Sequence, residues 1–270
     1  MAIIIILLVL LFIGATYLFL VMPRPSAGPD LAPILCDYAH RGLFDNKEIP
    51  ENSMAAFAHA VEKGVGIELD LHLSADGRVV VFHDATLARM CGKKAPISAL
   101  SWDQLKKERL LGTDQGIPLF EDVLRLVNGK VPLLIELKGE NTDDALCWKL
   151  APMLDAYSGE FCIESFNPLL LHWFAKHRPD MARGQLVTDL QKEGRQGSRL
   201  LNFALSKMLL NFLSRPDFIA CDGKYRKGLA LFVCRKLFRA PFFFWTVRKK
   251  ALLVHNRRRG DHSIFEGFEV

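Results

Sequence analysis

Short apolar runs alternate with amphipathic segments along most of the chain. Apolar runs between Gly and Pro signals indicate buried strands, and the segments between them have helical spacing. We expect strands over residues 34–39, 65–71, 78–82, 133–137, 161–164, 185–187, 218–221 and 242–247. We expect helices over 53–63, 119–127, 142–157, 168–176, 200–213 and 227–238. About eight strand–helix units in a chain of this length predict an α/β fold, a closed (β/α)8 TIM barrel.

The first 22 residues carry no charge and are almost wholly aliphatic. A membrane span needs about 20 apolar residues, so this segment is long enough to cross a bilayer. A secretory signal peptide would begin with basic residues, but no Lys or Arg precedes Arg24. We therefore expect an uncleaved, single-pass transmembrane helix over 1–22. A cleaved signal and a buried core helix are the alternatives.

Prolines and glycines then separate this segment from the rest of the chain. Residues 23–33 form a stiff linker that cannot continue a helix, and one domain follows over 34–270. The excess of positive charge after the span favours a cytoplasmic position for that domain. The six cysteines are scattered without a C-x-x-C pair. This spacing argues against a zinc site and favours free thiols in a reducing compartment.

The formal net charge is +5, and positive side chains crowd the last fifth of the chain, interleaved with aromatic residues. They are Lys224, Arg226, Lys227, Arg235, Lys236, Arg239, Arg248, Lys249, Lys250, Arg257, Arg258 and Arg259. Either this region lies on anionic lipid, or it forms amphipathic helices with basic solvent faces, and both interpretations stay open. No base-reading motif accompanies the charge, so we expect no nucleic-acid partner.

Titratable residues stand at the carboxyl ends of the expected strands. Glu68 and Asp70 share one face of a strand, because side chains alternate along it. With Glu136 from another strand they offer three carboxylates, which favour Ca²⁺ or Mg²⁺ over Zn²⁺. His40 and His83 each follow an apolar run, and two imidazoles can give and take protons across one substrate.

Two cationic side chains accompany these groups. Arg41 and Lys138 can hold phosphate oxygens, the first through its planar fork and the second as a point charge. The remaining histidines lie mainly in helix-like or surface contexts, and we interpret them as structural. They are His59, His72, His172, His177, His255 and His262.

Seven short motifs, in this order, resemble the glycerophosphodiester phosphodiesterase family. They are His40-Arg41-Gly42, Pro50-Glu51-Asn52-Ser53, Glu68-Leu69-Asp70, His83-Asp84, Glu136-Leu137-Lys138, Glu164-Ser165-Phe166 and Trp245-Thr246-Val247. The resemblance covers about residues 36–268. It implies a TIM barrel of the phospholipase-C-like phosphodiesterase type that uses Ca²⁺ or Mg²⁺. The implied reaction converts a glycerophosphodiester to an alcohol and glycerol 3-phosphate.

The resemblance also implies a role for each matching residue. The metal ligands are Glu68, Asp70 and Glu136, with Glu51 either a further ligand or a neighbour of the ligands; His40 and His83 are the general acid/base pair; Arg41 and Lys138 hold the phosphate; Trp245 walls the substrate pocket. One histidine takes the proton of the glycerol 2-hydroxyl, whose attack on phosphorus gives a cyclic phosphate. The other protonates the leaving alcohol, and water then opens the ring.

Two departures from the family pattern bear on the alcohol part of the substrate and on the last strand. Arg248 stands where the family usually has Asn, and residues 262–268 replace the usual ending. With the expected anchor, lysophospholipids of the bilayer join water-soluble glycerophosphodiesters as candidate substrates. A non-catalytic, membrane-anchored binding scaffold and a phosphatidylinositol-type phospholipase C remain the alternative functions.

Overall fold

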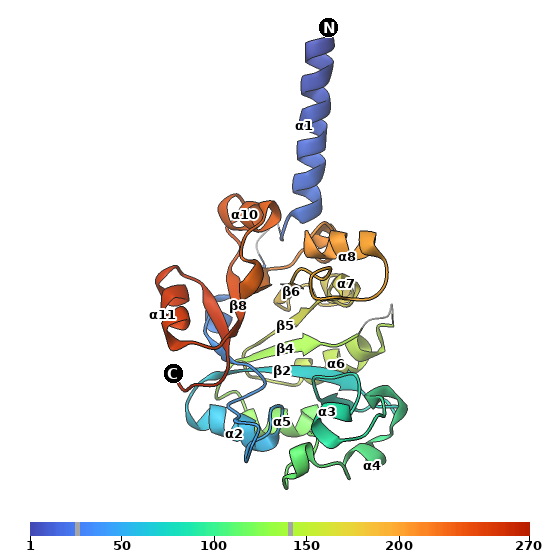
Figure 1. Ribbon diagram of the computed structural model, residues 1–270, viewed down its shortest axis with the longest axis vertical. Coiled ribbons are helices and arrows are strands. Elements are labelled where there is room, and N and C mark those ends of the chain that lie inside the picture. The colour runs from blue at the N-terminus through green and yellow to red at the C-terminus, as the bar shows by residue number, and fades with distance from the viewer. Residues whose placement is uncertain (25–27, 140–142) are drawn as a thin grey trace.

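The computed structural model describes residues 1–24, 28–139 and 143–270. Within these residues, eight parallel strands close into a barrel (Figure 1). They are β1 (Tyr38–Ala39), β2 (Gly66–Leu73), β4 (Leu133–Leu137), β5 (Phe161–Ser165), β6 (Arg183–Val187), β7 (Phe218–Asp222), β8 (Phe242–Val247) and β9 (His262–Phe265). The barrel closes because β1 pairs with both β2 and β9. The expected TIM barrel is thereby confirmed.

The expected strand over 34–39 is a strand only at Tyr38–Ala39, one further assignment was placed wrongly, and one barrel strand was missed. The expected strand over 78–82 is β3 (Val79–Val81), which pairs antiparallel with β2 as a hairpin and is not part of the barrel. The hairpin turns at Gly77, whose φ of +74° suits glycine. The eighth barrel strand is instead β9, which we did not predict. It is short and flanked by polar residues, so its apolar signal is weak.

Helices surround the barrel and follow most of the expected ranges. They are α2 (Met54–Glu62), α3 (Ala88–Cys91), α4 (Trp102–Leu105), α5 (Phe120–Val127), α6 (Ala145–Asp155), α7 (Pro168–His177), α8 (Arg199–Ser206), α9 (Asn211–Ser214), α10 (Leu229–Lys236) and α11 (Lys250–Arg258). The single helix expected over 200–213 is divided, because Met208 adopts a left-handed conformation between α8 and α9. The expected start of another helix at residue 142 lies outside the described residues.

Alternation along the strands separates two apolar layers. In β4, Leu133, Ile135 and Leu137 pack outward against the helices, whereas Leu134 faces the barrel interior. The interior is filled by residues such as Tyr38, Cys162, Phe218 and Phe243. In β2 the outward set is Ile67, Leu69 and Leu71. The intervening Glu68 and Asp70 therefore point into the barrel, as their spacing predicted.

The apolar N-terminal segment forms one helix, α1 (Ala2–Val21), which projects away from the barrel (Figure 1). It is long and apolar enough to cross a membrane. Its last residue, Val21, is fully buried against the barrel. The expected linker over 23–33 includes residues 25–27, which lie outside the described residues. In the part that is described, Arg24 pairs with Asp217 at 2.7 Å.

Some of the basic side chains in the C-terminal region form ion pairs. Arg235 lies 2.7 Å from Asp261, and Arg257 lies 2.5 Å from Asp37. Three of the aromatic residues between these charges, Phe242, Phe243 and Phe244, are buried in β8. Arg235 thus joins α10 to the residue before β9, and Arg257 joins α11 to the residue before β1.

Candidate active site

The acidic residues of three neighbouring strands meet inside the barrel. The register places Asp70 beside Glu136 and Glu136 beside Glu164. Oxygen atoms of Glu68, Asp70 and Glu136 lie within 4.8 Å of one another, and all three residues are buried. The structure therefore brings the three expected metal ligands together.

The turn after β1 brings Arg41 onto this cluster. Its backbone N–H donates to Glu68 Oε2 at 2.8 Å, and its Nε lies 3.5 Å from Asp70 Oδ2. Arg41 has a φ of +57°, and Gly42 follows with +84°. A Cβ at Gly42 would lie 2.9 Å from Ala56, so this turn requires glycine.

Glu51 lies behind Arg41. It accepts hydrogen bonds from Arg41 Nη1 at 2.6 Å and from Arg89 Nη2 at 2.7 Å. Burial raises its pKa, but the hydrogen bond from Arg89 and the charge of Arg41 outweigh burial and lower the pKa to about 2. The next residue, Asn52, donates from Nδ2 to Asp70 Oδ2 at 2.8 Å. Glu51 thus orients Arg41, and Asn52 orients a carboxylate.

Lys138 bridges two of the carboxylates. Its Nζ lies 2.8 Å from Asp70 Oδ1 and 2.7 Å from Glu136 Oε1. Burial opposes ionisation of Asp70, but the charges of Lys138, His83 and Arg41 hold its pKa well below the usual range. Asp70 is therefore the permanently ionised member of the cluster.

Both histidines are backed by a carboxylate. His40 Nδ1 lies 2.6 Å from Glu266 Oε2, and His83 Nδ1 lies 2.6 Å from Asp84 Oδ1. Burial lowers the pKa of His40 below its ordinary value, and the hydrogen bond to Glu266 offsets only part of this effect. A carboxylate on Nδ1 leaves Nε2 of each ring for the substrate.

Glu266 and Glu164 have places at the site that the sequence reasoning did not assign. Glu266 follows β9, so the missed strand hid its position. Glu164 was part of a family motif without a role; it is buried at the end of β5, and no hydrogen-bond partner for its Oε2 occurs among the described residues. The sequence pattern that identified Glu136, an acidic residue at the end of an apolar run, also occurs at Glu164 and could have identified it.

The charge balance of the cluster fits a divalent cation. Glu68, Asp70, Glu136 and Glu164 can carry four negative charges, whereas Arg41 and Lys138 supply two positive ones. Burial and the neighbouring carboxylates raise the pKa of Glu68 and Glu164 well above the usual value. A bound cation would offset this repulsion, and an all-oxygen donor set suits Ca²⁺ or Mg²⁺.

A cavity of about 700 Å³ opens onto these groups. Its lining includes His83, Glu136 and Lys138, together with His72, which we had interpreted as structural. The His72 ring contacts the His83 carbonyl at 3.2 Å. The volume is in the range of small-ligand sites.

Trp245 lies behind the cavity wall. Its ring packs edge-on against Phe166 with centroids 5.7 Å apart, and Phe166 lines the cavity. The indole Nε1 donates to the Ala220 carbonyl at 3.1 Å, which fixes the ring.

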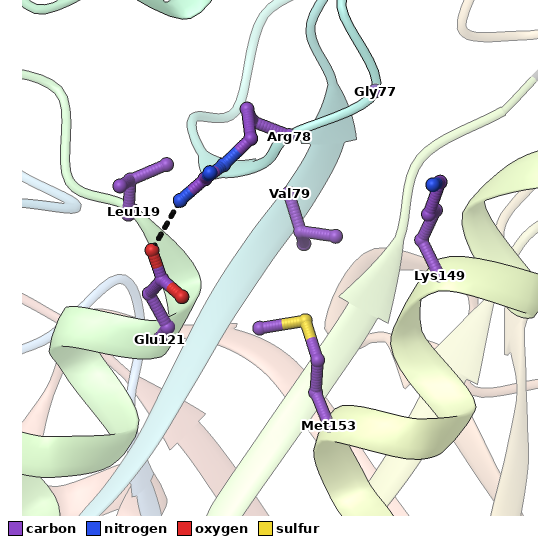
Figure 2. A pocket seen from close by; sticks show the side chains of 7 residues that line it. All are labelled: Gly77, Arg78, Val79, Leu119, Glu121, Lys149 and Met153. Carbon is purple, nitrogen blue, oxygen red and sulfur yellow. Dashed lines mark hydrogen bonds and ion pairs between the residues drawn. The ribbon is translucent and has the colours of Figure 1, made fainter.

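A second, much smaller cavity of about 90 Å³ lies between the β2–β3 hairpin, α5 and α6 (Figure 2). Figure 2 shows Arg78 and Glu121 paired at one side, with Lys149 and Met153 at the other. None of the predicted site residues lines it. It is a gap between packed elements, and the chemistry gathers at the larger cavity.

A closed parallel barrel with a buried carboxylate cluster, two cations and two carboxylate-backed histidines at the carboxyl ends of its strands is typical of a barrel enzyme for phosphorylated substrates. The model of the glycerophosphoryl diester phosphodiesterase family matches residues 40–265. A glycerophosphodiester phosphodiesterase of Caldanaerobacter subterraneus is 30% identical over 226 residues, which cover 78% of this chain and 85% of that relative. The chain therefore belongs to the glycerophosphoryl diester phosphodiesterase family.

Further similarities concern the substrate and the fold. Lysophospholipase D GDPD1 of Rattus norvegicus is 34% identical over 135 residues, which cover 45% of this chain and 41% of that protein. A phosphodiesterase of Oleispira antarctica, solved with sn-glycerol-3-phosphate as product, shares the fold with a TM-score of 0.69 and 20% identity over 86% of this chain and 92% of that chain. The glycerophosphodiester phosphodiesterase of Thermotoga maritima has a TM-score of 0.65 and 26% identity, covering 85% and 94%.

Proposed function

We propose that this protein is a metal-dependent enzyme that hydrolyses glycerophosphodiesters to an alcohol and glycerol 3-phosphate. The observation that carries the proposal is the buried group of Glu68, Asp70 and Glu136, whose oxygens lie within 4.8 Å of one another. Family membership supports the reaction class. The intact site argues against a non-catalytic scaffold.

The three carboxylates would hold Ca²⁺ or Mg²⁺. Such a cation, when bound, lowers the pKa of a hydroxyl that it contacts and offsets the charge of a phosphate. Asn52 and Lys138 orient Asp70, so the ligand geometry is set before the substrate arrives. Lys138 borders the cavity and is placed to contact a phosphate oxygen. Arg41 is held in place by Glu51 and Asp70. In that position its guanidinium is the second proposed contact to a phosphate oxygen.

His40 is the proposed base and His83 the proposed acid. Burial favours the neutral form of His40, so its Nε2 can take the proton of the glycerol 2-hydroxyl. That oxygen bonds to phosphorus, the bond from phosphorus to the alcohol oxygen breaks, and His83 protonates the departing oxygen. Water then adds to the cyclic phosphate with the two roles exchanged, which yields glycerol 3-phosphate and restores both histidines.

This chemistry limits the lipid substrates. A diacyl lipid has no free 2-hydroxyl, whereas a 1-acyl lysophospholipid keeps one. The apolar α1 helix would anchor the barrel, residues 34–270, at a membrane through the 23–33 linker, with the barrel on the cytoplasmic side. Similarity to a lysophospholipase D supports the same substrate class. We therefore propose lysophospholipids of the bilayer as substrates beside soluble glycerophosphodiesters.

The products of lysophosphatidylcholine cleavage by the full chain test this substrate assignment. The proposal predicts choline and lysophosphatidic acid. Phosphocholine and monoacylglycerol would instead indicate phospholipase-C-type cleavage. Activity on glycerophosphocholine without any on lysophosphatidylcholine vesicles would rule out the lipid substrate but keep the phosphodiesterase assignment.

A further inference from the structure

Two helices beside the root of α1 carry exposed apolar side chains. Figure 1 shows α8 and α10 on either side of the point where α1 leaves the barrel. The exposed residues are Leu200, Leu201 and Phe203 on α8, with Leu229, Phe232 and Leu237 on or directly after α10. We call this set the α8/α10 face. Leu200 is 77% exposed and Phe232 61% exposed, which is unusual for such side chains on a water-facing surface.

The last residues of α1 contact the barrel directly. Val21 is buried, and its carbonyl accepts a hydrogen bond from Asn211 Nδ2 at 3.0 Å. Arg215 Nη1 donates to the carbonyls of Phe19 and Met22 at 3.0 and 3.1 Å. The Arg215 guanidinium also lies 4.6 Å from the centre of the Phe19 ring. The direction of α1 relative to the barrel is therefore determined by these contacts.

This attachment sets the position of the barrel relative to a membrane. A span requires about 20 residues, and α1 supplies 20. Its last turns then lie at the boundary between hydrocarbon and headgroups. Because those turns contact α9 and α10, the neighbouring α8/α10 face lies at the same boundary.

A lysine-lined cavity of about 490 Å³ lies at this junction. Tyr17 of α1, Phe203 of α8 and Leu231 of α10 all line it. So do Lys192, Lys207 and Lys227, opposed by one acidic residue, Asp189, which pairs with Lys192 at 3.2 Å. The cavity is thus apolar on its α1 side and positively charged overall, which suits an anionic phospholipid.

We propose that the α8/α10 face docks on an anionic bilayer, with the lysine-lined cavity receiving the phosphate of a bilayer phospholipid. The proposal rests on insertion of α1 in that bilayer, but it does not depend on catalysis. The segment 188–195 links the two sites: Asp189 and Lys192 line the lysine cavity, whereas Leu190 and Arg195 line the active-site cavity. Docking therefore holds the active-site cavity next to the lipid surface.

Fluorescence quenching of the full chain in lipid nanodiscs tests the proposal. Tryptophan is introduced by Phe232→Trp on the face, by Leu10→Trp in α1 as a positive control, and by Val254→Trp on α11 as a matched exposed control. The quencher is phosphatidylcholine brominated near the headgroup end of its acyl chains for Phe232→Trp and Val254→Trp, and near the methyl end of the chains for Leu10→Trp, in each case mixed with phosphatidylserine. Each signal is compared with that of the wild-type tryptophans.

We expect quenching at Leu10→Trp and Phe232→Trp but not at Val254→Trp. Quenching at Leu10→Trp alone would overturn the docking face while leaving the anchor in place. Quenching at neither position would overturn both. Equal quenching at Val254→Trp and Phe232→Trp would also contradict a specific face.

The lysines are tested in the same system. The triple variant Lys192→Gln/Lys207→Gln/Lys227→Gln in the Phe232→Trp background should lose the gain in quenching caused by phosphatidylserine, a gain that we expect to be about two-fold. The exposed lysines of the variant Lys94→Gln/Lys107→Gln/Lys130→Gln serve as the matched control and should leave that gain unchanged. An unchanged gain in the first variant would show that the cavity lysines do not contact anionic lipid.

Discussion

His40 Nδ1 lies 2.6 Å from Glu266 Oε2, so the histidine that follows the first barrel strand is held by the residue that follows the last one. The backbone N–H of His40 also donates to the Phe265 carbonyl at 2.8 Å. Closure of the barrel and orientation of the proposed base thus depend on the same pair of strands. Glu266 belongs to the segment that departs from the usual family ending, and we propose that it positions His40.

Replacement of Glu266 by Gln should shift the pH profile of activity. The carboxylate raises the pKa of His40, so its removal should lower that pKa and move the acidic limb of the rate profile to lower pH. We expect kcat to fall about ten-fold, because the ring is less firmly oriented. A pH–rate profile of the variant checks this. An unchanged profile would show that Glu266 does not influence the base.

Arg248→Asn, which restores the usual family residue, should have a small opposite effect. Arg248 Nε donates to Glu266 Oε1 at 2.6 Å, and its side chain is 64% exposed. Without this cation the Glu266 charge acts more fully on His40, so the acidic limb should move to higher pH. We expect kcat to stay within about two-fold, since the pair is screened by solvent. A shift of the acidic limb to lower pH would contradict the idea that Arg248 weakens the effect of the Glu266 charge on His40.

Glu51 should stabilise the fold in a pH-dependent manner. Its pKa falls from 4.5 to about 2, as the two arginine contacts outweigh burial. A lowered pKa contributes stability above pH 4.5 that is lost as the pH falls toward about 2. Glu51→Gln should cost on the order of 2 kcal/mol at neutral pH, and less in acid. Urea unfolding at several pH values measures this, and a pH-independent loss would be inconsistent with the ion-pair account.

Asp70→Asn should weaken metal binding strongly. Asp70 is the ionised carboxylate at the centre of the cluster, with contacts to Lys138, Arg41 and Asn52. We expect affinity for Ca²⁺ or Mg²⁺ to fall by about 100-fold or more, as measured by calorimetry. Asp103→Asn on α4 is the exposed control and should bind as the wild type does. Unchanged affinity in Asp70→Asn would place the metal elsewhere.

The strand ends and their chemistry could be predicted because they are encoded locally. Glu68 and Asp70 share a face by the two-residue repeat, and each expected ligand and both histidines directly follow apolar runs. The barrel was predicted from the number of these runs, which came to eight because the run over 78–82 was counted and β9 was not. These local patterns were sufficient to predict the fold and most of the residues of the site.

The parts that were missed depend on contacts between distant segments. The β3 hairpin has the same apolar signal as a barrel strand, and only pairing with β2 distinguishes it. β9 has only two apolar residues, Ile264 and Phe265, between polar neighbours, so its apolar signal is weak and Glu266, the partner of His40, was missed with it. The ion pairs of Arg235 and Arg257 join residues far apart in sequence, which a charge count along the chain does not reveal.

The most direct test of metal-dependent, two-histidine catalysis is a coupled glycerol 3-phosphate assay with glycerophosphocholine and glycerophosphoglycerol. The full chain is assayed with Ca²⁺, with Mg²⁺ and with chelator, beside His40→Ala and the exposed control His255→Ala. We predict product with one of the metals, none with chelator, and a rate at least about 1,000-fold lower for His40→Ala but not for His255→Ala. Equal rates with metal and with chelator, or a fully active His40→Ala variant, would contradict the account.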